Sequence, residues 1–286
     1  MKLKDIATRA AAGTLYILFI LLGVLGGRVS FLIIFGAILG ISLFEFYRMM
    51  EKDTEHAISK IFNIIMGVVI FFTVFLYLEE ISFIALPIAV LLYLLILISS
   101  AIFIKRLDIL HGIIYSGFGQ MYITMPLSML MFMSYSFPSE SGGVGYQYAP
   151  VLAMFVIIWV NDTAAYFFGS LLGKRKLIEH ISPKKSVEGF IAGIFFSLVA
   201  SFVFAAIYTN YSTIFWLIFA AVVALFGTLG DLFESLIKRT SSVKDSGSII
   251  PGHGGILDRI DSMLVAIPAI YIYLTILSWF KSIKSA

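Results

Sequence analysis

The residues best suited to chemistry lie in one short polar segment, from Ser235 to Asp261. It contains the runs Lys244-Asp245, Pro251-Gly-His-Gly-Gly255 and Asp258-Arg-Ile-Asp261, and apolar runs of membrane-spanning length flank it on both sides. Charged side chains beside a hydrocarbon layer are costly and mark functional sites. Carboxylates, cations and flexible glycines together suit a metal ion that is bound with phosphates.

Aspartates recur in three separate apolar stretches. Asp258 and Asp261 are three residues apart at the start of a predicted helix, so both are expected on the same side of it. Asp231 and Asp162 each fall inside another apolar stretch, several residues from its nearest end. Two structural alternatives stay open: a helix N-cap with a first-turn acid for the first pair, and an ion pair for Asp231.

The ligand types favour a hard cation. A carboxylate in a bilayer must pair, protonate or bind a cation, because burying it alone is costly. Oxygen ligands favour Mg²⁺ over zinc, and the chain has no Cys. His253 stands alone in a Gly-rich loop and is a weak zinc signal. The pattern therefore predicts a Mg²⁺ site built from aspartates.

Lysines and arginines gather near these aspartates. They fit either a cytoplasmic surface in contact with anionic lipid or the binding of a polyphosphate. Binding of a polyphosphate is favoured for Lys244 and Arg259, which lie inside the acidic segment, and the run Pro251 to Gly255 could add backbone N–H donors. The other candidates in the two basic connectors are Ser182, Lys184, Lys185, Lys238 and Arg239.

The composition is that of an integral membrane protein. Of 286 residues, 60% are hydrophobic and 13% are charged, whereas a soluble domain carries about a quarter charged residues. About 20 apolar residues span a bilayer, which predicts an all-α, polytopic fold with about nine transmembrane helices. The segments are 11–27, 29–49, 60–78, 82–104, 111–134, 147–172, 187–208, 212–237 and 257–280.

Orientation follows from the basic residues. With the N-terminus in the cytoplasm, the cytoplasmic segments and their flanks hold 17 of the 20 Lys and Arg, the exceptions being Arg28, Lys281 and Lys284. Both charge-rich connectors, 173–186 and 238–256, then lie on the cytoplasmic side. We expect the N-terminal segment to be retained, because no small-residue cleavage site follows its apolar run.

The first 145 residues offer little chemistry. Glu45 and Arg48 are expected to form an interfacial ion pair, and Tyr115, Ser116 and Gln120 are expected to form interhelical hydrogen bonds. We therefore divide the chain into residues 1–145, a scaffold for lipid access or oligomer contact, and residues 146–286, a catalytic region.

Two blocks resemble one family. The run Ser235-x-Ile-Lys-Arg239, followed by Lys244-Asp-x-Gly247 and then Ile250-Pro-x-His-Gly-Gly-Ile-x-Asp-Arg-Ile-Asp261, is similar to the signature of the CDP-diacylglycerol synthases, or phosphatidate cytidylyltransferases. A second block, from Asn161 to Gly189, also resembles this family. The resemblance covers about residues 160–262, and Ala192 before Gly193 is a departure that affects helix packing.

The resemblance implies that CTP and phosphatidate give CDP-diacylglycerol and pyrophosphate. A lipid phosphate oxygen would attack the α-phosphate of the nucleotide, so metal ions and basic side chains must neutralise both anions, and no strong general base is required. It also implies a homodimer and an active site on the cytoplasmic side of the cell (inner) membrane. The expected partners are CTP, phosphatidate and the lipid bilayer, and no nucleic acid is expected.

Residue roles follow from the same resemblance. Asp231, Asp258 and Asp261 would bind two cations, one of them Mg²⁺, with Asp162 as a further contributor. Phosphate contacts would come from Lys244, Arg259, Lys238 and Arg239, and further nucleotide or lipid contacts from Ser182, Lys184, Lys185 and His253.

Two other classes of membrane protein are alternatives to this function. CDP-alcohol phosphotransferases carry an Asp-Gly-x-x-Ala-Arg pattern, which this chain lacks. A cation transporter could use buried aspartates, but it usually shows two related halves with interrupted helices. The residues with candidate chemistry here are confined to the C-terminal half.

Overall fold

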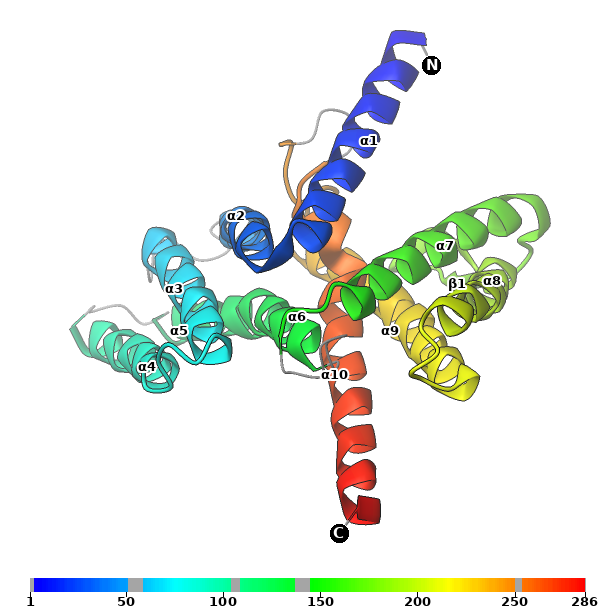
Figure 1. The fold of residues 1–286 in the computed structure, drawn as a ribbon. Helices are drawn as coiled ribbons and strands as arrows, with labels where there is room; N and C mark the ends of the chain where they lie inside the picture. Colours follow the sequence, from blue (N-terminus) through cyan, green and yellow to red (C-terminus); the bar gives the residue numbers. More distant parts are fainter. Residues whose placement is uncertain (1–2, 51–58, 104–108, 137–144, 250–253, 286) are drawn as a thin grey trace. The chain divides into compact units, whose positions relative to one another are not determined.

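The computed structural model describes residues 3–50, 59–103, 109–136, 145–249 and 254–285 (Figure 1). These residues are mostly helical, as predicted. The helices are α1 Leu3–Leu25, α2 Gly27–Met50, α3 Lys60–Leu78, α4 Ala85–Phe103, α5 Ile109–Gly119, the π-helix η1 Gln120–Thr124, α6 Met125–Tyr135, α7 Ala149–Leu172, α8 Val187–Ile207, α9 Thr213–Thr240 and α10 Leu257–Ser285.

The predicted spans coincide with helices. Each of the nine segments falls on one helix, except the fifth, which falls on the run α5, η1 and α6. Six helices among the described residues are long and apolar enough to cross a membrane: α2, α3, α7, α8, α9 and α10. Shorter apolar stretches lie in α1 and α4, at Ala11–Leu25 and Ala85–Ser100. The chain is therefore a multi-pass membrane protein, and the count of nine stays a prediction.

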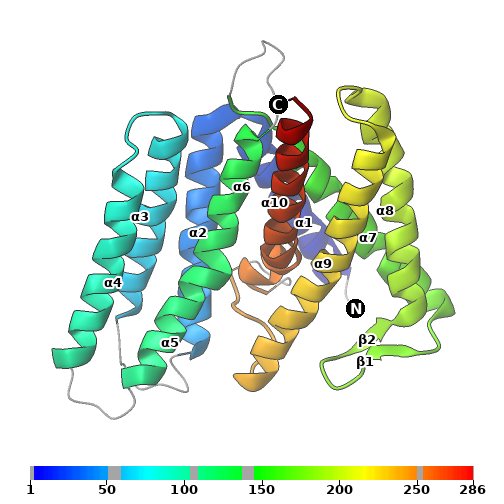
Figure 2. The ribbon, with the colours of Figure 1, turned by 90° about the horizontal axis from the view of Figure 1, so that it is seen from below.

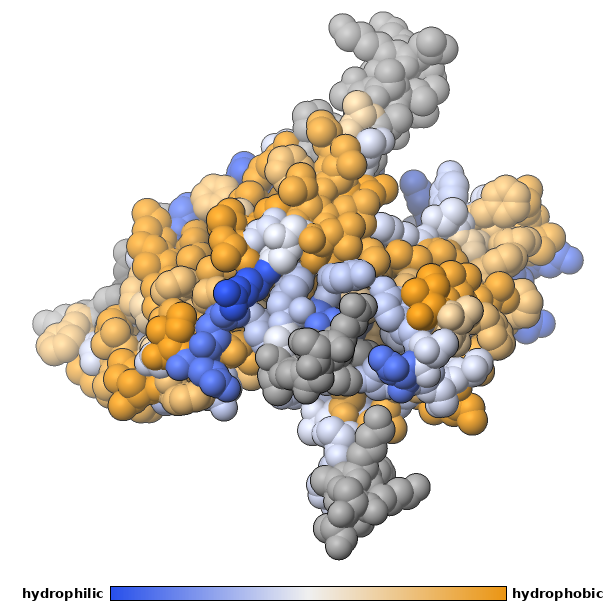
Figure 3. All heavy atoms as spheres, in the orientation of Figure 1, coloured by the Kyte–Doolittle hydropathy of each residue, from blue (hydrophilic) through white to orange (hydrophobic). Residues whose placement is uncertain are grey.

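The turn between α1 and α2 and the apolar surface of the helices are consistent with a membrane protein. Gly27 adopts a φ of +85° where α1 meets α2, a left-handed conformation that glycine tolerates, and so allows a tight turn between the two helices. The face drawn in Figure 3 is largely apolar over α4 and α8. Exposed side chains of α4 and α8 include Leu95 and Phe202, as expected where a helix faces lipid rather than water.

The chain forms two compact units. The first unit is Met1–Tyr148 with Thr240–Arg259, and the second unit is Ala149–Arg239 with Ile260–Ala286. The segment Thr240–Arg259, which carries much of the family signature, thus packs with the N-terminal helices. The roles of scaffold and catalytic region assigned to the two parts of the sequence stay predictions.

In the first unit, α2 packs against α1 and α3, α3 packs against α4, and the run α5, η1 and α6 packs against α2 and α3 (Figure 2). A buried polar network joins these helices. Asn63 donates to Ser116 Oγ (3.0 Å) and accepts from Tyr93 (2.9 Å), and Gln120 donates to the Asn63 carbonyl (2.7 Å). The interhelical bonds expected of Ser116 and Gln120 are confirmed, whereas the described contacts include none from the Tyr115 side chain.

The second unit is built on the close pair α7 and α8. A Cβ on Gly189 would lie 2.6 Å from the Ala165 carbonyl oxygen, and a Cβ on Gly193 would lie 2.6 Å from Asn161 Oδ1. Both glycines are therefore needed for the approach of the two helices. The first turn of α8 is capped by Ser186, whose hydroxyl accepts from Gly189 N (3.2 Å).

A short β-hairpin precedes α8. Its strands, β1 Lys176–Ile178 and β2 Ser182–Ser186, are antiparallel, with Lys176 opposite Ser186. Glu188 anchors the entry to the hairpin by accepting from the backbone N–H groups of Lys174 and Arg175. The sequence indicated only a charged connector here, because strands this short carry no clear periodicity.

Candidate active site

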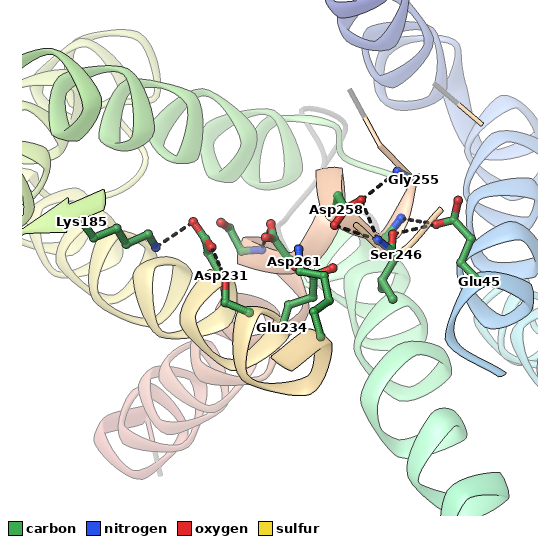
Figure 4. A network of polar contacts seen from close by, with 12 residues as sticks. Glu45, Lys185, Asp231, Glu234, Ser246, Gly255, Asp258 and Asp261 are labelled. Atoms are coloured by element: carbon green, nitrogen blue, oxygen red, sulfur yellow. Dashed lines mark hydrogen bonds and ion pairs between the residues drawn. The ribbon is translucent and has the colours of Figure 1, made fainter. Parts of the chain in front are cut away.

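The first polar cluster belongs to the first unit and is named the loop cluster: Glu45, Ser246, Gly255, Ile256, Leu257 and Asp258. Asp258 lies in the first turn of α10 and reaches back to the preceding loop (Figure 4). Its Oδ2 accepts from Ser246 N (3.0 Å) and from Gly255 N (2.8 Å). The carboxylate thus holds two N–H groups of the loop against the start of α10.

Glycine is required in this loop. Gly254 has a φ of +85°, and a Cβ there would lie close to Asp258 Oδ2. A side chain would therefore cost both backbone strain and the approach of the loop to Asp258. This gives the glycine-rich signature a structural reason that is independent of any bound phosphate.

Glu45 is the main functional candidate that sequence reasoning missed. It lies in α2, is almost fully buried, and accepts from Leu257 N (2.8 Å), Ile256 N (3.1 Å) and Ser246 Oγ (3.2 Å). The expected ion pair with Arg48 is wrong, because the structure records these partners for Glu45 and no ion pair between the two described residues. A carboxylate within an apolar helix was the available signal, but its partners lie about 200 residues away in sequence.

The second polar cluster belongs to the second unit and is named the carboxylate cluster: Asp162 on α7, Asp231 on α9 and Asp261 on α10. Asp231 and Asp162 are both close enough to Asp261 to repel its carboxylate. The predicted convergence of acids from three helices is therefore present for these residues. Such like charges favour a bound cation, since a cation offsets the repulsion.

A lysine already neutralises part of this charge. Lys185, on β2, places its Nζ 2.7 Å from Asp231 Oδ2 (Figure 4). The ion pair weighed as an alternative for Asp231 is thus present, and its partner comes from the hairpin. Both side chains are partly exposed, at 26% and 35%, so the pair is accessible to an incoming anion or cation.

Small residues bring α9 and α10 together. A Cβ on Gly230 would lie 2.5 Å from the Asp261 carbonyl oxygen and 3.0 Å from that of Ser262. Asp261 also accepts from Ser262 N (2.6 Å). Gly230 therefore allows the close approach of α10, and this approach sets Asp261 near Asp231.

Neighbouring polar side chains complete the cluster. Asn161 donates to Asp162 Oδ1 (3.3 Å) and to the Thr228 hydroxyl (3.4 Å). Lys238, predicted to contact substrate, forms an ion pair with the buried Glu234 one turn earlier in α9. Lys238 therefore has a structural partner within its own helix, and a phosphate would compete with Glu234 for it.

The remaining predicted residues are scattered over exposed positions. Lys184, Arg239, Lys244 and Arg259 have exposed side chains, and Ser182 is half-buried at the start of β2. The Arg259 carbonyl accepts from the Tyr16 hydroxyl of α1 (3.0 Å). His253 lies outside the described residues. The geometry of the described residues assigns no ligand to these side chains, so their substrate contacts stay predictions.

The donor set of the carboxylate cluster fits a hard cation in its chemistry. It consists of oxygen ligands, and Asp231 already accepts the ammonium group of Lys185. As the side chains lie, no group of three or more His, Asp or Glu residues in the described part of the chain is arranged to hold a metal ion. A cation bound here would compete with the Lys185 ammonium group for Asp231.

The fold and these two clusters define a helical membrane protein with aspartates organised around its apolar helices. Comparison with known proteins places it more closely. The profile of the cytidylyltransferase family matches residues 7–277. The chain belongs to the cytidylyltransferase family, in agreement with the resemblance of its motifs.

Curated relatives carry a more specific name. Phosphatidate cytidylyltransferase of Staphylococcus saprophyticus is 42% identical over 167 residues, 58% of this chain and 57% of the relative. Its namesake in Staphylococcus aureus is 38% identical over 196 residues, 68% of each chain. That of Bacillus subtilis is 49% identical over 124 residues, 43% of this chain and 46% of the relative. The matched part thus spans a little over half of the first relative.

Proposed function

We propose that this protein transfers the cytidylyl group of CTP to phosphatidate, giving CDP-diacylglycerol and pyrophosphate in phospholipid biosynthesis. The observation that carries the proposal is the carboxylate cluster, in which acids from three apolar helices interact and one of them, Asp231, forms an ion pair with Lys185. Family membership and the names of the relatives support the choice of substrates.

The proposed reaction breaks one phosphoanhydride bond of CTP and forms a new one to the phosphate of phosphatidate. A phosphate oxygen of phosphatidate attacks the α-phosphorus of CTP, the bond from that phosphorus to the bridging oxygen breaks, and pyrophosphate leaves with the electron pair. The attacking phosphate is already an anion, so the step needs no strong base. The protein's task is to hold two anions together and to stabilise charge that moves to the leaving group.

The proposed roles follow the charges. Lys185 and Lys238 are salt-bridged to carboxylates of α9 and would turn to the phosphates, and Lys244 and Arg259 are exposed cations of the signature segment. Mg²⁺ held by Asp231, Asp261 and Asp162, with Asp258 as a fourth candidate, would supply positive charge that neutralises the phosphates. A second cation is part of the proposal, as is a homodimer.

The test is incorporation of label from α-labelled CTP into lipid by purified protein with phosphatidate vesicles and Mg²⁺. We expect labelled CDP-diacylglycerol and an equal amount of pyrophosphate. Vesicles containing diacylglycerol instead of phosphatidate provide the control, because they lack the attacking phosphate. Absence of labelled lipid from folded protein would overturn the proposal, and turnover that survives chelation of divalent cations would overturn its metal dependence.

The proposed location is the cell membrane, crossed nine times, with the active site facing the cytoplasm. It is tested with cysteines at Lys176 and Asn210, which are exposed residues before and after α8. The native chain has no Cys, so an impermeant thiol reagent has no background. In intact cells we expect labelling at Asn210 only, and labelling at Lys176 would reverse the orientation.

A further inference from the structure

The start of α10 is held by a carboxylate from a distant helix. The backbone N–H groups of Gly255, Ile256 and Leu257 are consecutive, and each donates to a carboxylate. Asp258 takes the first and Glu45 takes the other two. Because a helix N-terminus carries a partial positive charge, the anion of Glu45 also interacts favourably with the helix dipole.

Ser246 links the two carboxylates. Its N–H donates to Asp258 (3.0 Å) and its hydroxyl donates to Glu45 (3.2 Å). Release of Glu45 would therefore loosen both sides of the loop cluster, not one hydrogen bond alone. The loop and α10 carry the signature residues Lys244, Arg259 and Asp261.

Two glycines make room for Glu45. The three atoms nearest to a Cβ on Gly247 would all belong to Glu45, with the carboxylate carbon at 2.8 Å and Cγ at 3.2 Å. A Cβ on Gly255 would meet both Glu45 and the Ser246 hydroxyl. Since Glu45 is fully engaged by hydrogen bonds, it cannot move aside without giving up those bonds.

We infer that Glu45 is a positioning residue for the cytidylyl transfer. It caps α10 from α2, sets the residue at which the helix begins, and so fixes the loop and first turn that present the signature side chains. It touches no reacting atom. The inference rests on the proposed function for its kinetic consequence, but the capping contact itself does not.

The first test separates positioning from general support of the fold. Glu45→Gln keeps the size of the side chain but presents an amide N–H₂ to backbone donors. We expect kcat to fall about tenfold to a hundredfold, as for residues that orient ligands, and the KM for CTP to rise while that for phosphatidate stays nearly constant. Glu45→Asp, which keeps the charge, should recover part of the activity, and Arg48→Gln is the matched control.

A purely structural role predicts a different pattern. Glu45→Gln would then lower the fraction of folded protein and leave both KM values unchanged, which would overturn the inference. Unchanged kcat together with unchanged KM values would overturn it as well.

The second test is a double-mutant cycle between Glu45→Ala and Gly247→Ala. Gly247→Ala alone should resemble Glu45→Ala, because the new Cβ displaces the carboxylate, and the double variant should be no worse than Glu45→Ala. Gly117→Ala is the control, since no atom lies within 4 Å of a Cβ at that position. Additive losses would overturn the inference.

The cycle can be measured in thermal stability as well as in turnover. Wild-type protein that is folded but inactive with CTP and phosphatidate would overturn the proposed function. The stability cycle would still decide whether Glu45 holds the loop, so the two failures are distinguishable.

Discussion

The loop cluster and the carboxylate cluster are both built on carboxylates, but the partners of these carboxylates differ. In the loop cluster, Asp258 and Glu45 accept hydrogen bonds from backbone N–H groups and a hydroxyl. In the carboxylate cluster, Asp261 is repelled by two other acids, and Asp231 forms an ion pair with Lys185.

This difference distinguishes carboxylates that hold the backbone in place from carboxylates that are available to bind a cation. Neutral backbone donors hold a carboxylate in place and are satisfied by it, so such a site gains stability from its charge. Acids that repel one another lose stability unless a cation joins them. We therefore expect the carboxylate cluster to bind cations, and phosphates through them, and the loop cluster to hold the backbone in place.

The largest effect is expected at Asp261. Asp261→Asn should reduce turnover at least about a hundredfold, because charge stabilisation at the reacting phosphates is lost. It should leave thermal stability unchanged or higher, since one repelling charge is removed. Turnover and thermal unfolding of the same preparation measure both. The control is Glu179→Gln in the exposed hairpin turn, and wild-type turnover of Asp261→Asn would remove this residue from the mechanism.

Asp258→Asn sharpens the contrast. We expect a similar loss of turnover, because the loop that carries the signature is no longer held. In addition, stability should fall by about 1–3 kcal/mol, since two backbone donors lose an anionic acceptor. Thermal unfolding against Asp261→Asn gives the comparison. If both variants were equally stable, the distinction between the two clusters would be lost.

An intermediate effect is expected at Lys185. Lys185→Met should lower kcat about tenfold to a hundredfold if the ammonium group stabilises phosphate charge, and should raise the KM for CTP. Lys176→Met on the neighbouring strand is the control. If Lys185 serves only as the partner of Asp231, the losses should not be additive. The double variant Lys185→Met with Asp231→Asn would then lose less activity than the two single losses combined.

The smallest effect is expected at Ser246. Ser246→Ala removes the hydroxyl bond to Glu45 but retains the N–H bond to Asp258, so stability should fall by about 1 kcal/mol and turnover only a few-fold. Ser248→Ala, at an exposed position of the same loop, is the control. A loss as large as that of Asp258→Asn would show that the hydroxyl has a further role.

The local and periodic features of this protein could be predicted from its sequence. Apolar runs of bilayer length placed most helices to within a few residues, although α1 begins at Leu3 and not at residue 11. Short-range spacing placed Asp258 and Asp261 on one helix. Gly27 marked the turn between α1 and α2. The motif identified the family because its side chains stand at fixed spacing along the chain. All of these depend on neighbours in sequence.

Only the tertiary structure decided which distant groups meet. Glu45 reads as an interfacial acid next to Arg48 until α2 is placed against the loop that precedes α10. Lys185 reads as one basic residue among several until the hairpin turns it toward Asp231. Hydropathy and spacing carry no information about such pairings, because the partner of a buried charge is chosen by helix packing and not by its neighbours along the chain.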